Sequence, residues 1–212
     1  MDESAPRQKQ ILYFGDPMCS WCWGFAPVLE QISRLCAGRA KLHLIMGGLR
    51  PGSVVPWDEG LRSSIRHHWQ SVSDASGQPF DFARFDDQQF IYDTEPACRA
   101  LVSVRNVEPN KSLAMFEALQ RSFYAEDLDI TQTNVLSEIA ESVGVDKSVF
   151  LNLFNHHDTQ SLTNGDFVRT RNFGVQGFPS ILCQDGETIL VLTSGYQSYS
   201  ALVPQLEEWL NA

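Results

Sequence analysis

A pair of cysteines two residues apart, directly after an apolar run, constrains this chain more than any other feature of its sequence. The run is Ile11–Phe14, the pair is Cys19-Ser20-Trp21-Cys22, and an amphipathic stretch begins at Trp23. This order predicts a buried strand, a turn and the start of a helix. The unpaired N–H groups and the dipole at a helix N-terminus favour a thiolate on the first cysteine. The motif therefore predicts thiol–disulfide exchange, with Cys19 as the nucleophile and Cys22 as the resolving thiol.

Two other interpretations of the cysteine pair are half of a zinc site and two inert core thiols. A structural zinc site needs four ligands, and the chain has no second C-x-x-C and no H-x-x-x-H. The histidine pairs at 67–68 and 156–157 are sequence neighbours, which do not share a helix face. We therefore expect a redox role and no metal.

Charge and composition argue against several classes of partner. The 212 residues carry a net charge of −10, which is the wrong sign for binding a nucleic-acid backbone. No Lys/Arg run would hold an anionic membrane, no apolar run approaches transmembrane length, and the polar segment 1–10 lacks the apolar core of a signal peptide. The cysteine count of five is odd, and Cys36, Cys98 and Cys183 lie in apolar or helical surroundings. We expect a reducing, cytoplasmic location with no nucleic-acid or membrane partner.

The pattern along the chain is typical of an α/β fold interrupted by helices. Residues 10–14 and 41–46 are predicted as parallel strands joined by a helix at 23–36. Strands return at 180–183 and 188–192, with the hairpin signal Asp185-Gly186 between them. From about 58 to 165 the spacing is helical and no strand pair is convincing. The helices predicted there and beyond are 97–104 (capped by Thr94), 111–123, 131–143, 146–155, 161–173 and 200–210.

A second chemical element is Gly177-Phe178-Pro179-Ser180, a proline at a predicted strand start. A cis bond there would expose the backbone N–H and C=O of Phe178 to an extended peptide. The alternative is a trans proline in an ordinary turn that begins a strand.

The chain resembles the DsbA-like branch of the thioredoxin superfamily in three features: Cys19-Ser20-Trp21-Cys22, the long helical region and the segment Gly174–Pro179. The likeness is strongest to the non-secreted members of that branch, known as predicted protein-disulfide isomerases or FrnE-like proteins. The resemblance covers nearly the whole chain. It implies a thioredoxin fold over residues 10–57 and 160–212 with an inserted all-helical domain at 58–159. It also implies that Cys19 is nucleophilic, that Cys22 resolves, and that Pro179 is cis beside them.

The sequence departs from that family in two places. Ser20-Trp21 replaces the Pro-His between the cysteines of periplasmic DsbA, and losing that histidine removes a thiolate stabiliser. We therefore expect a protein less oxidising than DsbA, whose potential is about −120 mV. Thioredoxin-like enzymes often place a buried acid six positions before the first cysteine, where this chain has Tyr13. Asp16 is nearer but is not expected to be buried, which leaves a carboxylate proton carrier unsupported.

The remaining candidates concern substrate contact. Trp21 is predicted to form an apolar rim, with Ser20 and Phe178 as the other substrate-binding residues, whereas Trp23 and Phe25 are expected in the core. Cys98 is interpreted as a buried helical cysteine, the alternative being a third redox thiol.

The function predicted from these residues is a thiol–disulfide oxidoreductase or isomerase acting on protein, peptide or small-molecule thiols and disulfides. It needs no separate cofactor, and glutathione is a candidate partner. The alternative is a glutathione-dependent isomerase or transferase resembling hydroxychromene-carboxylate isomerase or kappa-class glutathione transferase, whose members generally carry serine at the position of Cys19. A third class is a peptide-binding module with incidental cysteines. The oligomeric state stays open.

Overall fold

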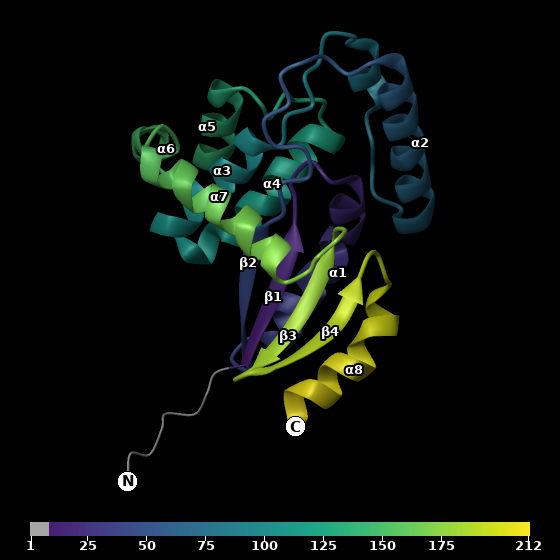
Figure 1. The fold of residues 1–212 in the computed structure, drawn as a ribbon, viewed down its shortest axis with the longest axis vertical. Helices are drawn as coiled ribbons and strands as arrows, with labels where there is room; N and C mark the ends of the chain where they lie inside the picture. The colour runs from purple at the N-terminus through teal and green to yellow at the C-terminus, as the bar shows by residue number, and fades with distance from the viewer. Residues whose placement is uncertain (1–8) are drawn as a thin grey trace.

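The computed structural model describes residues 9–212, and it is built on one four-stranded sheet (Figure 1). The strands are β1 (Lys9–Gly15), β2 (Ala40–Met46), β3 (Ser180–Asp185) and β4 (Thr188–Ser194), in the order β2-β1-β3-β4. The β1–β2 pair is parallel and the other two pairs are antiparallel, as the sequence predicts. The sheet is that of a thioredoxin-like α/β fold, which confirms the predicted fold class. The expectation that segment 1–10 is not a signal peptide concerns residues that lie almost wholly outside the described part of the chain.

The crossover between the parallel strands is helix α1 (Ser20–Cys36), which starts three residues earlier than the predicted helix. It runs on through Pro27. Ile11 and Tyr13 face the main core, which also contains the buried side of α1, whereas Leu12 and Phe14 enter a smaller cluster on the opposite face of the sheet. Because β1 is buried on both faces, its sequence is an unbroken apolar run rather than an alternation.

Helices fill the chain between β2 and β3 and gather beyond the ends of the strands at which Gly15 and Met46 lie (Figure 1). Two short 3₁₀ segments, η1 (Phe82–Asp86) and η2 (Pro109–Lys111), lie among them. The helices are α2 (Glu59–Ser76), α3 (Glu95–Val107), α4 (Ser112–Tyr124), α5 (Thr133–Ser142), α6 (Lys147–Phe154) and α7 (His157–Asn172). Within the described residues, no strand interrupts this helical stretch. The last helix, α8 (Tyr199–Asn211), packs on α1 and β4.

One predicted helix start and one predicted helix cap are wrong. Helix α7 begins at His157, four residues before the predicted start, because the His156 ring accepts the N–H of Asp158 and acts as an unusual cap. Thr94 occupies the predicted cap position of α3 without capping it, because its hydroxyl accepts the N–H of Arg50 instead. In both cases the spacing of residues in the sequence gives no sign of the hydrogen bond that decides the outcome.

The helical stretch is tied to the open edge of strand β2. The Asp166 carboxylate of α7 accepts the Met46 N–H at 3.0 Å, and Thr170 donates to the Met46 carbonyl. Arg105 of α3 donates to the Leu44 carbonyl and forms an ion pair with Asp166 at 2.7 Å. Helix α7 also crosses the predicted boundary between 159 and 160, and that division into domains stays a prediction.

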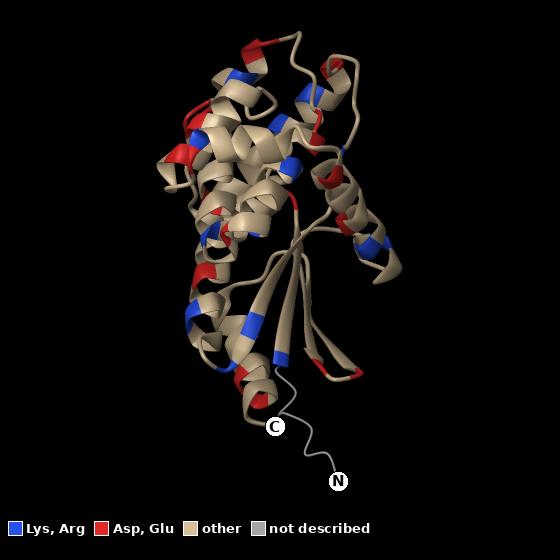
Figure 2. Cartoon of the chain, turned by 90° about the vertical axis from the view of Figure 1, so that its left-hand side faces the viewer, with Lys and Arg blue, Asp and Glu red and all other residues tan. Residues whose placement is uncertain are grey.

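Charged side chains are scattered over the molecule. In the view of Figure 2, Lys and Arg alternate with Asp and Glu along the helices, and the middles of the strands carry almost none. No helix within residues 9–212 combines the length and apolarity needed to cross a bilayer.

Candidate functional site

The two cysteines of the motif lie where β1 ends and α1 begins. Cys19 is the N-cap residue of α1, and its carbonyl accepts the N–H groups of Cys22 at 2.9 Å and Trp23 at 3.1 Å. Cys19 keeps 7% of its surface exposed and Cys22 keeps none, so Cys19 is the more accessible of the two thiols. Both are free thiols in this structure. The unpaired N–H groups of the first turn of α1 lie next to Cys19, where they favour negative charge.

The structure brings Cys19 together with a segment far away in the chain. The Phe178–Pro179 peptide bond is cis, as the resemblance to the DsbA-like branch implied. The Sγ of Cys19 lies 3.7 Å from the carbonyl oxygen of Phe178, across 159 residues. The segment is fixed from behind, because Gly195 donates to the Pro179 carbonyl at 2.7 Å and the Ser180 hydroxyl donates to that of Gly177.

A glycine in another loop makes room for Phe178. A Cβ on Gly47, which directly follows β2, would lie 2.1 Å from Cζ of the Phe178 ring. Three segments distant in sequence therefore meet here: the cysteine turn, the loop after β2 and the loop before β3. Gly47 was not singled out by sequence reasoning, since only the folded chain reveals the close approach.

The aromatic residues around the cysteines divide as expected. Ser20 and Trp21 are half-buried at the surface, and the Trp21 ring packs against Tyr196 with centroids 5.5 Å apart. Trp23 and Phe25 are buried in the core. Tyr196, in the loop between β4 and α8, was not singled out from the sequence, and it extends the aromatic surface at Trp21.

Tyr13 lies behind Cys22. Its ring is fully buried between Phe25, which it stacks on at 6.3 Å, and Phe116, which it meets edge-on at 5.7 Å. Burial, and next the Cys22 thiol, hold the pKa of the Tyr13 hydroxyl well above its usual value. Burial, followed by Cys19, likewise raises the pKa of the Cys22 thiol well above 9.

The expectation that Asp16 is not buried is wrong, because its side chain is fully buried. Its carboxylate accepts the Met18 N–H at 2.9 Å and the Leu49 N–H at 2.7 Å, and the Cys98 thiol lies 3.4 Å from Oδ2. Burial raises the pKa of Asp16 even though these N–H groups oppose the shift. Burial and Asp16 together raise the pKa of Cys98 well above 9. A buried carboxyl group therefore does lie beside the cysteine turn, supplied by the turn itself rather than by β1.

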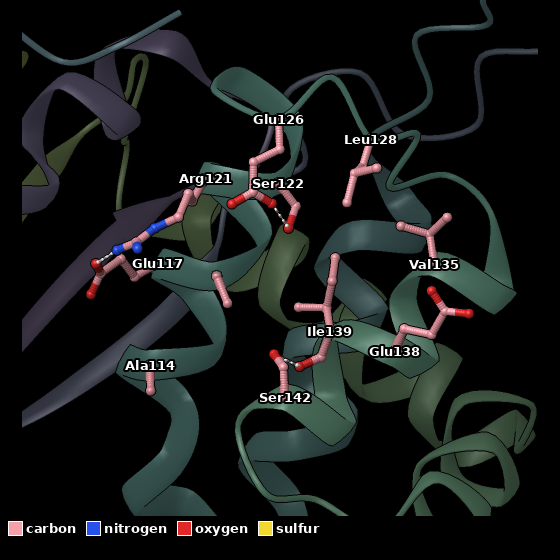
Figure 3. Close-up of a pocket in the computed structure, with 11 residues that line it drawn as sticks. Ala114, Glu117, Arg121, Ser122, Glu126, Leu128, Val135, Glu138, Ile139 and Ser142 are labelled. Carbon is pink, nitrogen blue, oxygen red and sulfur yellow. Dashed lines mark hydrogen bonds and ion pairs between the residues drawn. The ribbon is translucent and has the colours of Figure 1, made fainter. Parts of the chain in front are cut away.

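Other features of the surface lie away from the cysteines. A hollow of about 510 Å³ opens between α4 and α5, with Glu117, Glu126 and Ile139 among its lining residues (Figure 3). Neither motif cysteine nor Phe178 contributes to it. Residues 9–212 contain no group of three or more histidine, cysteine or acidic side chains placed to hold a metal ion. Cys36 and Cys183 are buried free thiols, whose pKa values burial raises to about 11 and about 12.

The C-x-x-C lies at the start of the helix that follows a central strand, and it faces a cis-proline. This arrangement is that of the thioredoxin-like fold found in thiol–disulfide oxidoreductases. Residues 10–207 match the DSBA-like thioredoxin domain family, and the chain belongs to that family.

Two solved structures and one curated protein illustrate the likeness. A protein of Nitrosomonas europaea, provisionally assigned as a protein disulfide isomerase, is 38% identical with a TM-score of 0.91, covering 96% of this chain and 98% of that one. The cytosolic disulfide reductase DsbM of Pseudomonas aeruginosa, solved with GSH, is 22% identical with a TM-score of 0.71, over 95% and 96% of the two chains. The ClpXP adapter protein SpxH of Halalkalibacterium halodurans is 21% identical over 99% of this chain and 72% of its own length.

Proposed function

We propose that this protein is a thiol–disulfide oxidoreductase in which Cys19 attacks and Cys22 resolves. The observation that carries the proposal is the position of the Cys19 Sγ, at the helix N-terminus and 3.7 Å from the Phe178 carbonyl, with Cys22 buried one turn behind. An attacking thiol needs access and thiolate character, and the resolving thiol needs only to reach the first.

The reaction exchanges two electrons without another cofactor. The Cys19 thiolate attacks one sulfur of a substrate disulfide, forming a mixed disulfide and releasing the first substrate sulfur as a thiolate. Cys22, once deprotonated, attacks the Sγ of Cys19, which forms the Cys19–Cys22 disulfide and releases the second sulfur. The protein dithiol is oxidised, the substrate disulfide is reduced, and the two protons end on the substrate thiols. In the reverse direction the protein oxidises a substrate dithiol.

The substrates we propose are protein or peptide thiols and disulfides. An extended peptide beside Cys19 can pair with the backbone of Phe178, and Trp21 with Tyr196 offers an apolar rim for its side chains. Glutathione is a second candidate, supported by the DsbM relative solved with GSH. The odd cysteine count and the burial of Cys36, Cys98 and Cys183 outside the motif favour a reducing, cytoplasmic compartment.

Insulin reduction by Cys19→Ser and Cys22→Ser variants tests the proposal, with Cys36→Ser as the matched control because that thiol is also buried and lies at the far end of α1. We expect Cys19→Ser to lose activity, Cys22→Ser to stall as a mixed disulfide, and Cys36→Ser to keep normal turnover. Activity that depends on bound glutathione and survives Cys22→Ser would instead identify a glutathione-dependent isomerase or transferase. Chaperone activity without turnover would identify a peptide-binding module.

A further inference from the structure

A tyrosine hydroxyl without a hydrogen-bond partner lies behind the resolving cysteine. Tyr13 is fully buried on β1, and its Oη has no partner within the described residues. Cys22 is buried in the same core, and after burial its thiol has the largest effect on the pKa of the Tyr13 hydroxyl. Buried polar groups are almost always paired, because leaving one unpaired costs stability. The Tyr13 hydroxyl therefore has an unused hydrogen-bond donor, which a nearby group that becomes a strong acceptor can take.

The Tyr13 hydroxyl cannot easily turn elsewhere. Its ring is packed between Phe25 of α1 and Phe116 of α4. Gly15, two residues along β1, leaves the space that the ring occupies: a Cβ there would lie 2.5 Å from Cε1 and 2.9 Å from the hydroxyl oxygen. The ring is thus held in place by its neighbours on α1, α4 and β1.

We propose that Tyr13 is a positioning residue that donates a hydrogen bond to Cys22 whenever Cys22 is a thiolate. A thiol sulfur is a weak acceptor, whereas a thiolate in a dry site is a strong one. The proposal rests on the proposed function, because exchange chemistry is what creates that thiolate.

The thiolate of Cys22 arises in both directions of exchange. When the protein reduces a substrate, Cys22 loses its proton to the thiolate released in the first step and then attacks the Sγ of Cys19. When the protein oxidises a substrate, an incoming thiolate attacks Cys19 and Cys22 leaves as the thiolate. Tyr13 keeps its own proton throughout, because burial holds the pKa of its hydroxyl well above 10. It stabilises the charge and does not act as the base.

The other groups around Cys22 oppose or share this role. Burial and the neighbouring Cys19 thiol disfavour the Cys22 thiolate, so both raise the pKa of Cys22. The backbone at Asp16 and the Tyr13 hydroxyl act in the opposite direction and lower it. Of these two, only the hydroxyl can be removed without changing the fold of the main chain.

The test is a titration of Cys22 in a Cys19→Ala background, with and without Tyr13→Phe. The pH dependence of the Cys22 ¹³Cβ chemical shift reports thiolate formation at that residue alone. We expect Tyr13→Phe to reduce the thiolate population at a given pH about ten- to a hundredfold, as for a lost hydrogen bond to a charged group. In the protein with both cysteines, resolution of the mixed disulfide should slow by a similar factor and need a higher pH.

Tyr124→Phe is the matched control, since Tyr124 is also fully buried and its hydroxyl is also unpaired. It should leave the Cys22 titration unchanged. An unchanged titration in Tyr13→Phe overturns the inference, as does a failure of that variant to fold, because removing an unpaired hydroxyl should not unfold the chain. The titration needs no turnover, so a shifted titration in an inactive protein would contradict the proposed function and leave the role of Tyr13 standing.

Discussion

At the scale of single residues, Asp16 shows how the cysteine turn is held. Its two carboxylate oxygens accept N–H groups from the turn before Cys19 and from the loop after β2, and they lie next to the thiol of Cys98 on α3. One fully buried side chain thus joins three parts of the chain close to Cys19. Its burial also gives the stability of the protein a specific dependence on pH.

We predict that Asp16 makes the protein less stable as pH rises. Because the folded-state pKa of Asp16 is raised from 3.8, the folded chain holds this proton more tightly than the unfolded chain does. The free energy of unfolding therefore falls from pH 3.8 upward until the folded-state pKa is passed. Urea unfolding of wild type and Asp16→Asn across this range should show the difference between the two shifting in favour of the variant as pH rises.

Asp146 supplies a control of opposite sign. Hydrogen bonds from Ser148 and Val149 at the start of α6 lower its pKa below 3.8, so its contribution is present above that pH and is lost as pH falls. Asp146→Asn keeps a good cap and removes only the titration. If Asp16→Asn and Asp146→Asn changed with pH in the same direction, the burial of Asp16 would not be the cause.

At the scale of elements, the loop after β2 controls the position of the loop before β3. We predict that Gly47→Ala lowers stability by about 1–3 kcal/mol, as overpacking does, because the Phe178 ring must move away from the new methyl group. Since the Phe178 carbonyl lies 3.7 Å from Cys19, disulfide exchange should slow as well. Thermal unfolding and insulin reduction measure the two effects.

Gly165→Ala is the control for Gly47→Ala. Gly165 lies inside α7 and a Cβ there meets nothing within 4 Å. It should raise stability by about 0.5–1 kcal/mol through helix propensity and leave exchange unchanged. Normal exchange in a destabilised Gly47→Ala protein would show that the position of Phe178 does not matter for turnover.

The same elements show what a sequence can and cannot predict. The parallel pair, the hairpin, the helical region and the cis-proline all follow from local patterns of apolar spacing, turn residues and the resemblance. The burial of Asp16 depends on Leu49 and Cys98, 33 and 82 residues away, and no local pattern reports it. The start of α7 and the hydroxyl of Thr94 depend on hydrogen bonds that compete with ordinary capping. The predictions that failed concern polar side chains whose hydrogen-bond partners cannot be read from the spacing of residues in the sequence.

At the scale of the whole molecule, the reduction potential reports how strongly the protein stabilises the Cys19–Cys22 dithiol relative to the disulfide. We predict a potential more negative than the value of about −120 mV for DsbA, because Ser20-Trp21 places no histidine beside the Cys19 thiolate. Equilibration with glutathione buffers, followed by the fluorescence of Trp21 and Trp23, measures it. Trp21→His should raise the potential toward that of DsbA. A wild-type value near −120 mV would refute the argument.

The contact between Cys19 and Phe178 also has a consequence during synthesis of the chain. Cys19 leaves the ribosome 159 residues before Phe178, and β1 gains its neighbour β3 only with the last part of the chain. At about 5–20 residues per second, that interval lasts on the order of ten seconds. Throughout it, both thiols are present without the backbone that would align a substrate. For that interval the nascent chain therefore carries the Cys19–Cys22 dithiol without the Phe178 carbonyl that lies beside Cys19 in the folded protein.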